Sequence, residues 1–118
     1  MAYLLLIVEP RDQRSQRTPA EAESAYARML EFADRLSARG VLKACESLRS
    51  DGDAVRVRRR SGSTSLIDGP FTESKEMVGG FFLLDCDSRA EAIAIAEACP
   101  AAEWASVEVR EVAPCHEG

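Results

Sequence analysis

The segment Tyr3-Leu4-Leu5-Leu6-Ile7-Val8 decides the fold, because it is an unbroken apolar run of strand-forming residues. Pro10 stops the run, which is far too short to cross a bilayer, so it predicts a β-strand buried on both faces. A second run of this kind follows later in the chain, at Gly80-Phe81-Phe82-Leu83-Leu84-Asp85-Cys86. Strands that are apolar on both faces belong in the middle of a sheet, and these two segments therefore predict its central strands.

A long helix is predicted between these two strands. Thr18 is its N-cap, with Pro19 at the first helical position and Glu21 three residues after the cap, which is the pattern of a capping box. Gly40 supplies the C-terminal stop. Apolar residues recur at three- and four-residue spacing and predict one buried stripe: Ala22, Ala25, Tyr26, Met29, Leu30, Ala33 and Leu36.

Shorter strands follow this helix. Residues 41–48 and 55–58 have the composition of strands separated by a turn at 50–53, and we expect them to pair as a hairpin. After a further turn at 60–63, residues 65–67 form a minimal strand.

The C-terminal part completes a known pattern. Ser88 and Glu91 form a second capping box, and Pro100 closes the short helix that begins there. Residues 104–112 alternate and predict a last strand with one buried face. The order strand, helix, strand, extra hairpin, strand, helix, strand indicates an α+β, ferredoxin-like split βαβ fold with an extra hairpin, in one domain over residues 1–118.

Two helices cover only one face of such a sheet. The apolar side chains on its other face need a cover, and a second copy that packs sheet to sheet in a two-fold dimer is the most economical one. The sequence therefore predicts a homodimer.

The composition excludes several classes of partner. The chain has 118 residues, of which 46% are hydrophobic and 30% are charged, and this composition is that of an ordinary globular protein. Its net charge of −5 disfavours nucleic acid and anionic membranes, and we expect neither as a partner. A local basic run is explained by a solvated strand face: Arg56, Arg58, Arg59 and Arg60.

The cysteines and the histidine suggest no metal or redox chemistry. The four cysteines have no C-x-x-C spacing, and the single histidine, His116, lies in the tail. We therefore expect buried free thiols, no metal and no cofactor. The N-terminus lacks the basic region of a secretory signal, so the cytoplasm is the expected compartment.

A motif follows the minimal strand. Asp68-Gly69-Pro70-Phe71 precedes Thr72-Glu73-Ser74-Lys75-Glu76 and then Gly79-Gly80-Phe81-Phe82-Leu83-Leu84. This order resembles the signature of the DGPF-domain proteins, a branch of the YCII-related family. The N-terminal strand and residues 39–42, 99–102 and 107–110 are also similar to the family's pattern, so nearly the whole chain is covered.

The resemblance implies a ferredoxin-like fold assembled as a dimeric α+β barrel. Most members are uncharacterised small bacterial proteins, many encoded beside sigma factors of the extracytoplasmic-function group, which suggests a sigma factor as a partner. Some relatives act on small chlorinated aromatic or lactone substrates, and a histidine-aspartate pair in a cleft has been proposed to carry activity. This chain keeps Asp68 but has no histidine between Glu21 and Arg39, where relatives place theirs.

Asp68 is the first candidate catalytic residue. It either holds the turn by accepting backbone N–H bonds or presents its carboxylate at a cleft as a general base, which requires a partner or a raised pKa. Phe71 either plugs the core or an interface, or offers a surface on which a ligand stacks. Gly79 and Gly80 allow a close backbone approach or a bulge where the strand begins.

The charged residues after the motif are further candidates. Glu73, Lys75 and Glu76 form either a solvated turn with weak ion pairs or the wall of a polar pocket. In such a pocket, Lys75 attracts an anionic group and Glu73 accepts a proton. Tyr3 either offers its hydroxyl to a cleft or is a packed aromatic residue.

These candidates support three hypotheses about function. The first is a dimeric small-molecule-binding or regulatory domain with a cleft near Asp68. The second is a cofactor-independent enzyme with Asp68 or Glu73 as general base and Lys75 or a tyrosine as helper, which predicts a carboxyl of raised pKa in a closed pocket. The third, which rests on the resemblance alone, is an interaction module for a sigma factor.

Overall fold

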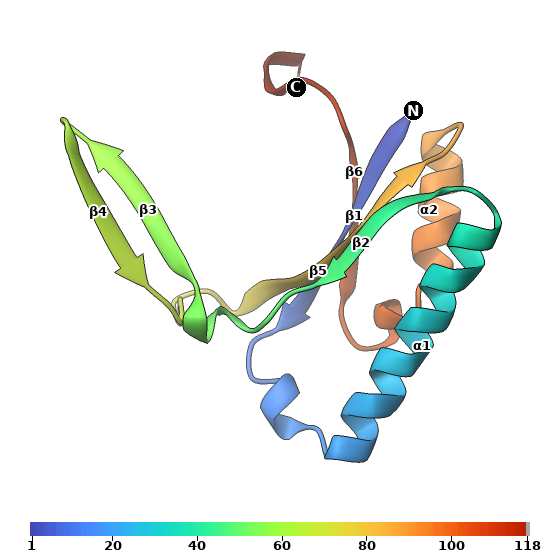
Figure 1. The fold of residues 1–118 in the computed structure, drawn as a ribbon, viewed down its shortest axis with the longest axis horizontal. Helices are drawn as coiled ribbons and strands as arrows, with labels where there is room; N and C mark the ends of the chain where they lie inside the picture. Colours follow the sequence, from blue (N-terminus) through green and yellow to red (C-terminus); the bar gives the residue numbers. More distant parts are fainter. Residues whose placement is uncertain (118) are drawn as a thin grey trace.

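In the computed structural model, which describes residues 1–117, a four-stranded antiparallel sheet carries two helices on one of its faces (Figure 1). The strands are β1 (Ala2–Pro10), β2 (Leu42–Ser47), β3 (Val55–Arg60), β4 (Ser63–Asp68), β5 (Glu76–Asp85) and β6 (Ser106–Glu111). The helices are α1 (Pro19–Ala38) and α2 (Arg89–Ala98), with short 3₁₀ segments at Arg14–Gln16, Asp51–Asp53, Pro100–Glu103 and Cys115–Glu117. The strand order β2-β5-β1-β6 is that of a ferredoxin-like α+β fold, which confirms the predicted fold class.

β1 and β5 form the centre of the sheet, as their apolar sequences predict. In their antiparallel register, Tyr3 lies opposite Leu84 and Leu5 lies opposite Phe82. These four side chains are buried in the core beneath the helices, and Leu5 has no exposed surface. The alternate residues of each strand therefore belong to the other face of the sheet.

α1 begins at the predicted capping box. The Thr18 hydroxyl accepts the Glu21 N–H at 3.1 Å, and the Glu21 carboxylate accepts the Thr18 N–H at 2.9 Å. Gly40 follows the helix with a φ of 75°, a left-handed conformation that glycine adopts without strain. In the C-terminal half of α1, the Phe32 ring packs edge-on against the Phe82 ring, with 5.3 Å between the centroids.

The part of α1 from Pro19 to Leu30 is only partly covered by the sheet, although its apolar stripe continues there. Tyr26 is 55% exposed and Leu30 is 48% exposed, whereas Leu36 near the end of the helix is 2% exposed. Figure 1 shows that α1 diverges from the sheet toward its N-terminus, so that a wedge opens between the two. The predicted stripe is therefore buried over only part of its length.

The extra hairpin corrects one predicted pairing. The sequence predicts that residues 41–48 pair with 55–58, but β2 pairs with β5, and β3 pairs with β4. The two-residue turn Ser61-Gly62, with positive φ at both positions, joins β3 to β4 and matches the twist of a tight hairpin. The expected pairing is wrong because residues 51–53 form a 3₁₀ segment that redirects the chain instead of reversing it.

The β3–β4 hairpin, residues 55–68, projects from the body and is called the arm below. Figure 1 shows that it leaves on the side of the sheet opposite to the helices. Every residue of its two strands is exposed. The radius of gyration is 16.2 Å, whereas a compact chain of this length has a radius of roughly 13 Å. The arm is therefore separate from the packed core.

The sheet face opposite to the helices, called the open face below, has no cover within residues 1–117. β1 presents Leu4 and Leu6 on this face, and β5 presents Phe81 and Leu83 opposite to them. All four side chains are only half-buried, because they have one another but no second layer as neighbours. The open face is thus an apolar surface at the centre of the sheet.

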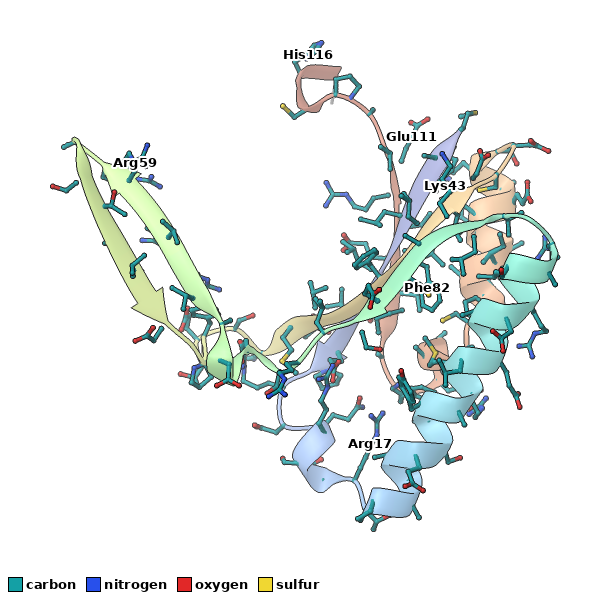
Figure 2. All side chains as sticks on the ribbon, in the orientation of Figure 1. Arg17, Lys43, Arg59, Phe82, Glu111 and His116 are labelled. Atoms are coloured by element: carbon teal, nitrogen blue, oxygen red, sulfur yellow. The ribbon has the colours of Figure 1, made fainter. Side chains whose placement is uncertain are left out.

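No helix among residues 1–117 is both long and apolar enough to cross a membrane. The same residues contain no group of three or more His, Cys, Asp or Glu side chains that could hold a metal ion. Cys86 and Cys99 are buried free thiols as expected, whereas Cys45 is half-buried and Cys115 is exposed. His116 is exposed near the C-terminus, away from the sheet (Figure 2).

Candidate functional site

A cavity of about 390 Å³ occupies the wedge between α1 and the sheet. Its volume lies in the range of sites that hold small molecules. In Figure 2, Arg17 lies beside the N-terminal half of α1 and Phe82 lies between the sheet and the helices. Apolar side chains form most of the lining, among them Ala25, Tyr26, Met29, Leu30, Phe82 and Trp104. The uncovered part of the α1 stripe is therefore one wall of a cavity.

An ion pair between Glu9 and Arg14 lies at the polar part of this cavity. Glu9 stands near the end of β1, and its side chain is only 8% exposed. Arg14 Nη2 donates to Glu9 Oε1 at 2.7 Å, and Arg14 Nε donates to Glu9 Oε2 at 3.0 Å. Arg14 also donates to the Leu48 carbonyl at 2.7 Å. Because both carboxylate oxygens accept hydrogen bonds from one guanidinium, the Glu9 side chain is held in place and forms a fixed wall of the cavity.

The ion pair depends on a glycine in β5. The register between β1 and β5 shifts between Ile7 and Val8, which leaves Gly79 as the extra residue of a bulge. A β-carbon at Gly79 would overlap the Glu9 carboxylate and lie 2.9 Å from Arg14 Nη2. The close approach predicted for the Gly79-Gly80 pair is confirmed, and it makes room for a buried ion pair.

Arg17 brings a second cation to the cavity. Its guanidinium lies over the Trp104 ring, 5.5 Å from the centroid, and its Nη2 donates to Gln13 Oε1 at 3.3 Å. Among residues 1–117, no carboxylate lies within ion-pairing distance of Arg17. A half-buried arginine that forms no ion pair can bind an anionic group of a ligand.

A second hollow, of about 500 Å³, lies at the base of the arm beside the DGPF turn. Pro70 and Thr72 line it, together with a bidentate ion pair between Arg11 and Asp51. Arg11 Nη1 and Nη2 donate to the two Asp51 oxygens at 2.7 Å each, and Arg11 Nε donates to the Ser74 carbonyl at 2.7 Å. The polar groups of this hollow are thus largely paired with one another.

Comparison with known proteins places the whole chain in one family. A family model described as the YCII-related domain matches residues 1–116. The chain belongs to the YCII-related family. A stretch of 40 residues is also 48% identical to an uncharacterised protein of Rhizobium meliloti (strain 1021) and covers 34% of this chain. That stretch is 32% of the other protein, so this YCII-related domain matches about a third of the length of its relative.

In this YCII-related domain, Asp68 does not hold the turn of the motif. It is exposed at the end of β4, opposite Val55, and lines neither of the two hollows. The carboxylate that accepts the Phe71 N–H, at 3.2 Å, belongs to Asp51. The role of Asp68 as the acceptor of the turn's N–H bonds is therefore wrong, because the 3₁₀ segment at 51–53 brings another aspartate to that position.

Phe71 and Glu73 meet the arm through one arginine. Phe71 is 9% exposed, and the Arg56 guanidinium lies 3.7 Å from its ring centroid. Arg56 Nη1 also donates to Glu73 Oε1 at 3.0 Å. The pKa of the exposed Glu73 carboxyl is lowered, first by its own backbone N–H and then by Arg56. A general base near neutral pH requires a raised pKa, and the Glu73 environment acts in the opposite direction.

The other three predicted site residues are dispersed. Lys75 has an exposed side chain and accepts the Arg11 backbone N–H at 2.9 Å through its carbonyl. Glu76 is exposed as the first residue of β5. Tyr3 is 3% exposed in the core, and burial is the main cause that raises its pKa. None of the six predicted residues lines the cavity beside α1.

Sequence reasoning missed Glu9, Arg14 and Arg17, the charged residues of the cavity. One signal was available, since Glu9 continues the alternation of Tyr3 and Ile7 on the buried side of β1. A carboxylate in phase with a buried stripe predicts a paired charge inside the protein. The partner, Arg14, lies in a short 3₁₀ segment whose sequence has no apolar periodicity, so its position cannot be derived from spacing.

The Arg11–Asp51 pair predicts an acid-dependent change at the base of the arm. Hydrogen bonds from Arg11 are the main cause that lowers the Asp51 pKa, and the Phe71 N–H adds to them. Since this pKa is lower in the folded chain, the stabilising contribution is complete above the unfolded value of about 3.9 and is lost as pH falls through the folded value. The Phe71 amide chemical shift, followed by NMR from pH 7 to pH 2, should therefore titrate with a midpoint below about 3.9.

Two variants separate this effect from general acid unfolding. Asp51→Asn should abolish the titration of the Phe71 amide, whereas Asp53→Asn, with an 82% exposed side chain, should leave it unchanged. An unaltered titration in the Asp51 variant would show that another group controls this turn.

Proposed function

We propose that this YCII-related domain is the protomer of a homodimer that binds a small, mainly apolar molecule with one anionic group in the cavity beside α1. The observation that carries the proposal is the uncovered half of α1. A helix normally buries its apolar stripe against the core, yet Tyr26 and Leu30 remain exposed around a space of about 390 Å³. A ligand in that space would complete the cover of the stripe.

The anionic group follows from the charges around the cavity. The negative charge of Glu9 is balanced by Arg14. Glu46 and Phe81, which lie opposite each other in the β2–β5 register, also border the space, and the Glu46 side chain is exposed to solvent. Arg17 is half-buried and forms no ion pair among residues 1–117, so it is the cation of the lining that a ligand anion can reach without displacing a carboxylate. A carboxylate or a similar anion is the group that a guanidinium binds best.

The homodimer in this proposal would cover the open face of the sheet. Leu4, Leu6, Phe81 and Leu83 form an apolar surface there that two copies would bury by packing face to face. A two-fold arrangement brings the same surface of both chains together, so one apolar patch serves as its own partner. Most residues that line the cavity come from α1 and from the helix side of the sheet, although Phe81 also borders it, and we expect the cavity to stay accessible in such a dimer.

The alternatives remain predictions with less support. A cofactor-independent enzyme using Asp68 or Glu73 needs a carboxyl of raised pKa in a closed pocket, and both residues are exposed. A sigma-factor partner is suggested by family association, and a pull-down at native expression tests it. We give the binding function precedence because a defined cavity supports it.

A thermal-shift experiment with matched probes tests the binding function. The probes are benzoate, phenylacetate and cinnamate, each paired with its neutral amide. A carboxylate present at ten times its Kd should raise the Tm by about 4 °C or more, and the amide by much less. Arg17→Gln should reduce the affinity for the carboxylates about tenfold and remove the preference over the amides.

Space-filling variants locate the bound probe. Ala25→Phe fills the cavity and should abolish the shift, whereas Ala27→Phe on the same helix, outside the cavity lining, should retain it. Asp68→Asn should also retain it. A shift that Asp68→Asn abolishes and Ala25→Phe preserves would place the ligand at the motif instead, and no shift with any probe would contradict the proposed ligand class.

A further inference from the structure

We propose that the β3–β4 arm grips a second copy of this chain. The inference rests on the homodimer proposed above, but it concerns a surface separate from both the open face and the cavity. It assigns a partner to the part of the molecule that has the least cover.

The arm has no cover of its own. Within residues 1–117, its strands pair only with each other, and all their residues are exposed. Val57 and Leu66 lie opposite each other in the register, and they are 65% and 67% exposed. A two-stranded hairpin alone in water is marginally stable, and its outer edges have unpaired backbone groups. The arm is therefore expected to gain stability from a protein surface beside it.

Hydrogen bonds and close backbone contacts fix the orientation of the arm at its base. Asp51 is fixed by Arg11 and accepts the Phe71 N–H, while Gly69 N–H donates to the Ala54 carbonyl at 2.7 Å. A β-carbon at Gly69 would overlap the Asp51 carbonyl oxygen, so these backbones are in close contact. A hairpin that is exposed and also firmly held at its base is suited to present a surface to a partner.

The charge of the arm identifies an acidic partner. Four arginines and one aspartate give residues 55–68 a formal charge of +3, so the rest of the chain carries −8 of the total of −5. Arg58 and Arg59 are exposed and form no ion pair within the described chain. Each copy thus carries both a basic arm and an acidic body. A second copy satisfies both surfaces in one two-fold assembly.

The direction of the arm agrees with this partner. The arm leaves the body on the side of the open face (Figure 1). A second copy that covers the open face would therefore lie beside the arm of the first, and by symmetry would place its own arm beside the first body. Nucleic acid would use only the basic arm and would leave the apolar residues Val57 and Leu66 exposed.

Two measurements on the full chain test the arm. Sedimentation velocity gives the dimer dissociation constant, and amide hydrogen exchange of β3 and β4 is measured above and below that concentration. We expect exchange in the arm to slow at least tenfold in the dimer. Raising salt from 0.05 to 0.5 M should weaken the dimer about tenfold, because exposed charge pairs are screened.

Charge-reversal variants supply the control. Arg58→Glu/Arg59→Glu changes the charge of the arm without removing an ion pair of the described chain, and it should raise the dissociation constant at least tenfold. Arg35→Glu/Arg89→Glu changes the net charge equally on exposed helix positions and should have a much smaller effect. Circular dichroism checks that both variants are folded.

Three outcomes would overturn the proposal. If the protein sediments as a monomer at all concentrations, no second copy is present for the arm to contact. A dimer in which the open face is protected but arm exchange is unchanged preserves the homodimer and rejects the arm's role in it. Arm protection that requires added duplex DNA assigns the basic surface to phosphate groups instead.

Discussion

Replacing Arg14 with alanine is expected to lower the free energy of unfolding by about 3 kcal/mol, because Glu9 would remain buried without a counter-charge. The Glu9 side chain is 8% exposed, and within residues 1–117 its two oxygens accept hydrogen bonds only from Arg14. Arg14 itself is 35% exposed, which places the expected loss at the lower end of values for buried pairs. Urea denaturation at fixed protein concentration measures the change.

A double variant that removes both charges separates the effect of an uncompensated charge from the effect of lost packing. Glu9→Gln/Arg14→Gln removes both charges and should be less destabilised than Arg14→Ala, because no uncompensated ion is left. Arg39→Ala removes an exposed ion pair with Glu91, whose atoms are 3.7 Å apart, and should change the stability little. Equal losses in the Arg14 and Arg39 variants would mean that the cavity wall does not depend on its ion pair.

Leu5→Ala and Leu4→Ala are expected to have different effects, although they are neighbours on β1. Leu5 is fully buried beneath the helices, so its truncation should reduce the stability of each protomer by about 3 kcal/mol. Leu4 lies on the open face, where the proposed dimer would bury it. Leu4→Ala should therefore change the protomer less and raise the dimer dissociation constant about tenfold.

Denaturation and sedimentation together distinguish these effects. Leu5→Ala should lower the urea midpoint at every protein concentration, whereas the Leu4→Ala deficit should shrink when the protein is diluted below its dimer dissociation constant. If Leu4→Ala leaves the association unchanged, the open face is not the surface that joins two copies.

The sequence predicted the core of the fold because that part follows local rules. The unbroken apolar runs of β1 and β5 predicted the two central strands, and the Thr18 capping box predicted the start of α1. The pairing of residues 41–48 with 55–58 was wrong because a turn-like composition does not say which strands it joins. Pairing across about 35 residues, as between β2 and β5, depends on the whole core.

The candidate site was harder to predict than the fold. The motif led to Asp68 and Glu73, but the structure places these residues at the base of the arm, and the cavity is lined by other side chains. Glu9, Arg14 and Gly79 come from a strand, a 3₁₀ segment and a bulge that meet only in the folded chain. Residues that are brought together only by the tertiary structure have no characteristic separation in the sequence, so a single sequence does not reveal their contact.

The segment between β2 and β5, which contains the arm, is held at both of its ends by the sheet, and this limits which parts of the chain can change in sequence or length. The Leu48 N–H still donates to the Gly79 carbonyl, at 2.9 Å, where the chain leaves β2 and where it returns in β5. The intervening excursion can therefore change in length or charge without shifting the register of the central strands. In the proposed dimer, such changes would alter the surface that the arm offers to the second copy while the paired ends, Leu48 and Gly79, keep their place in the cavity lining.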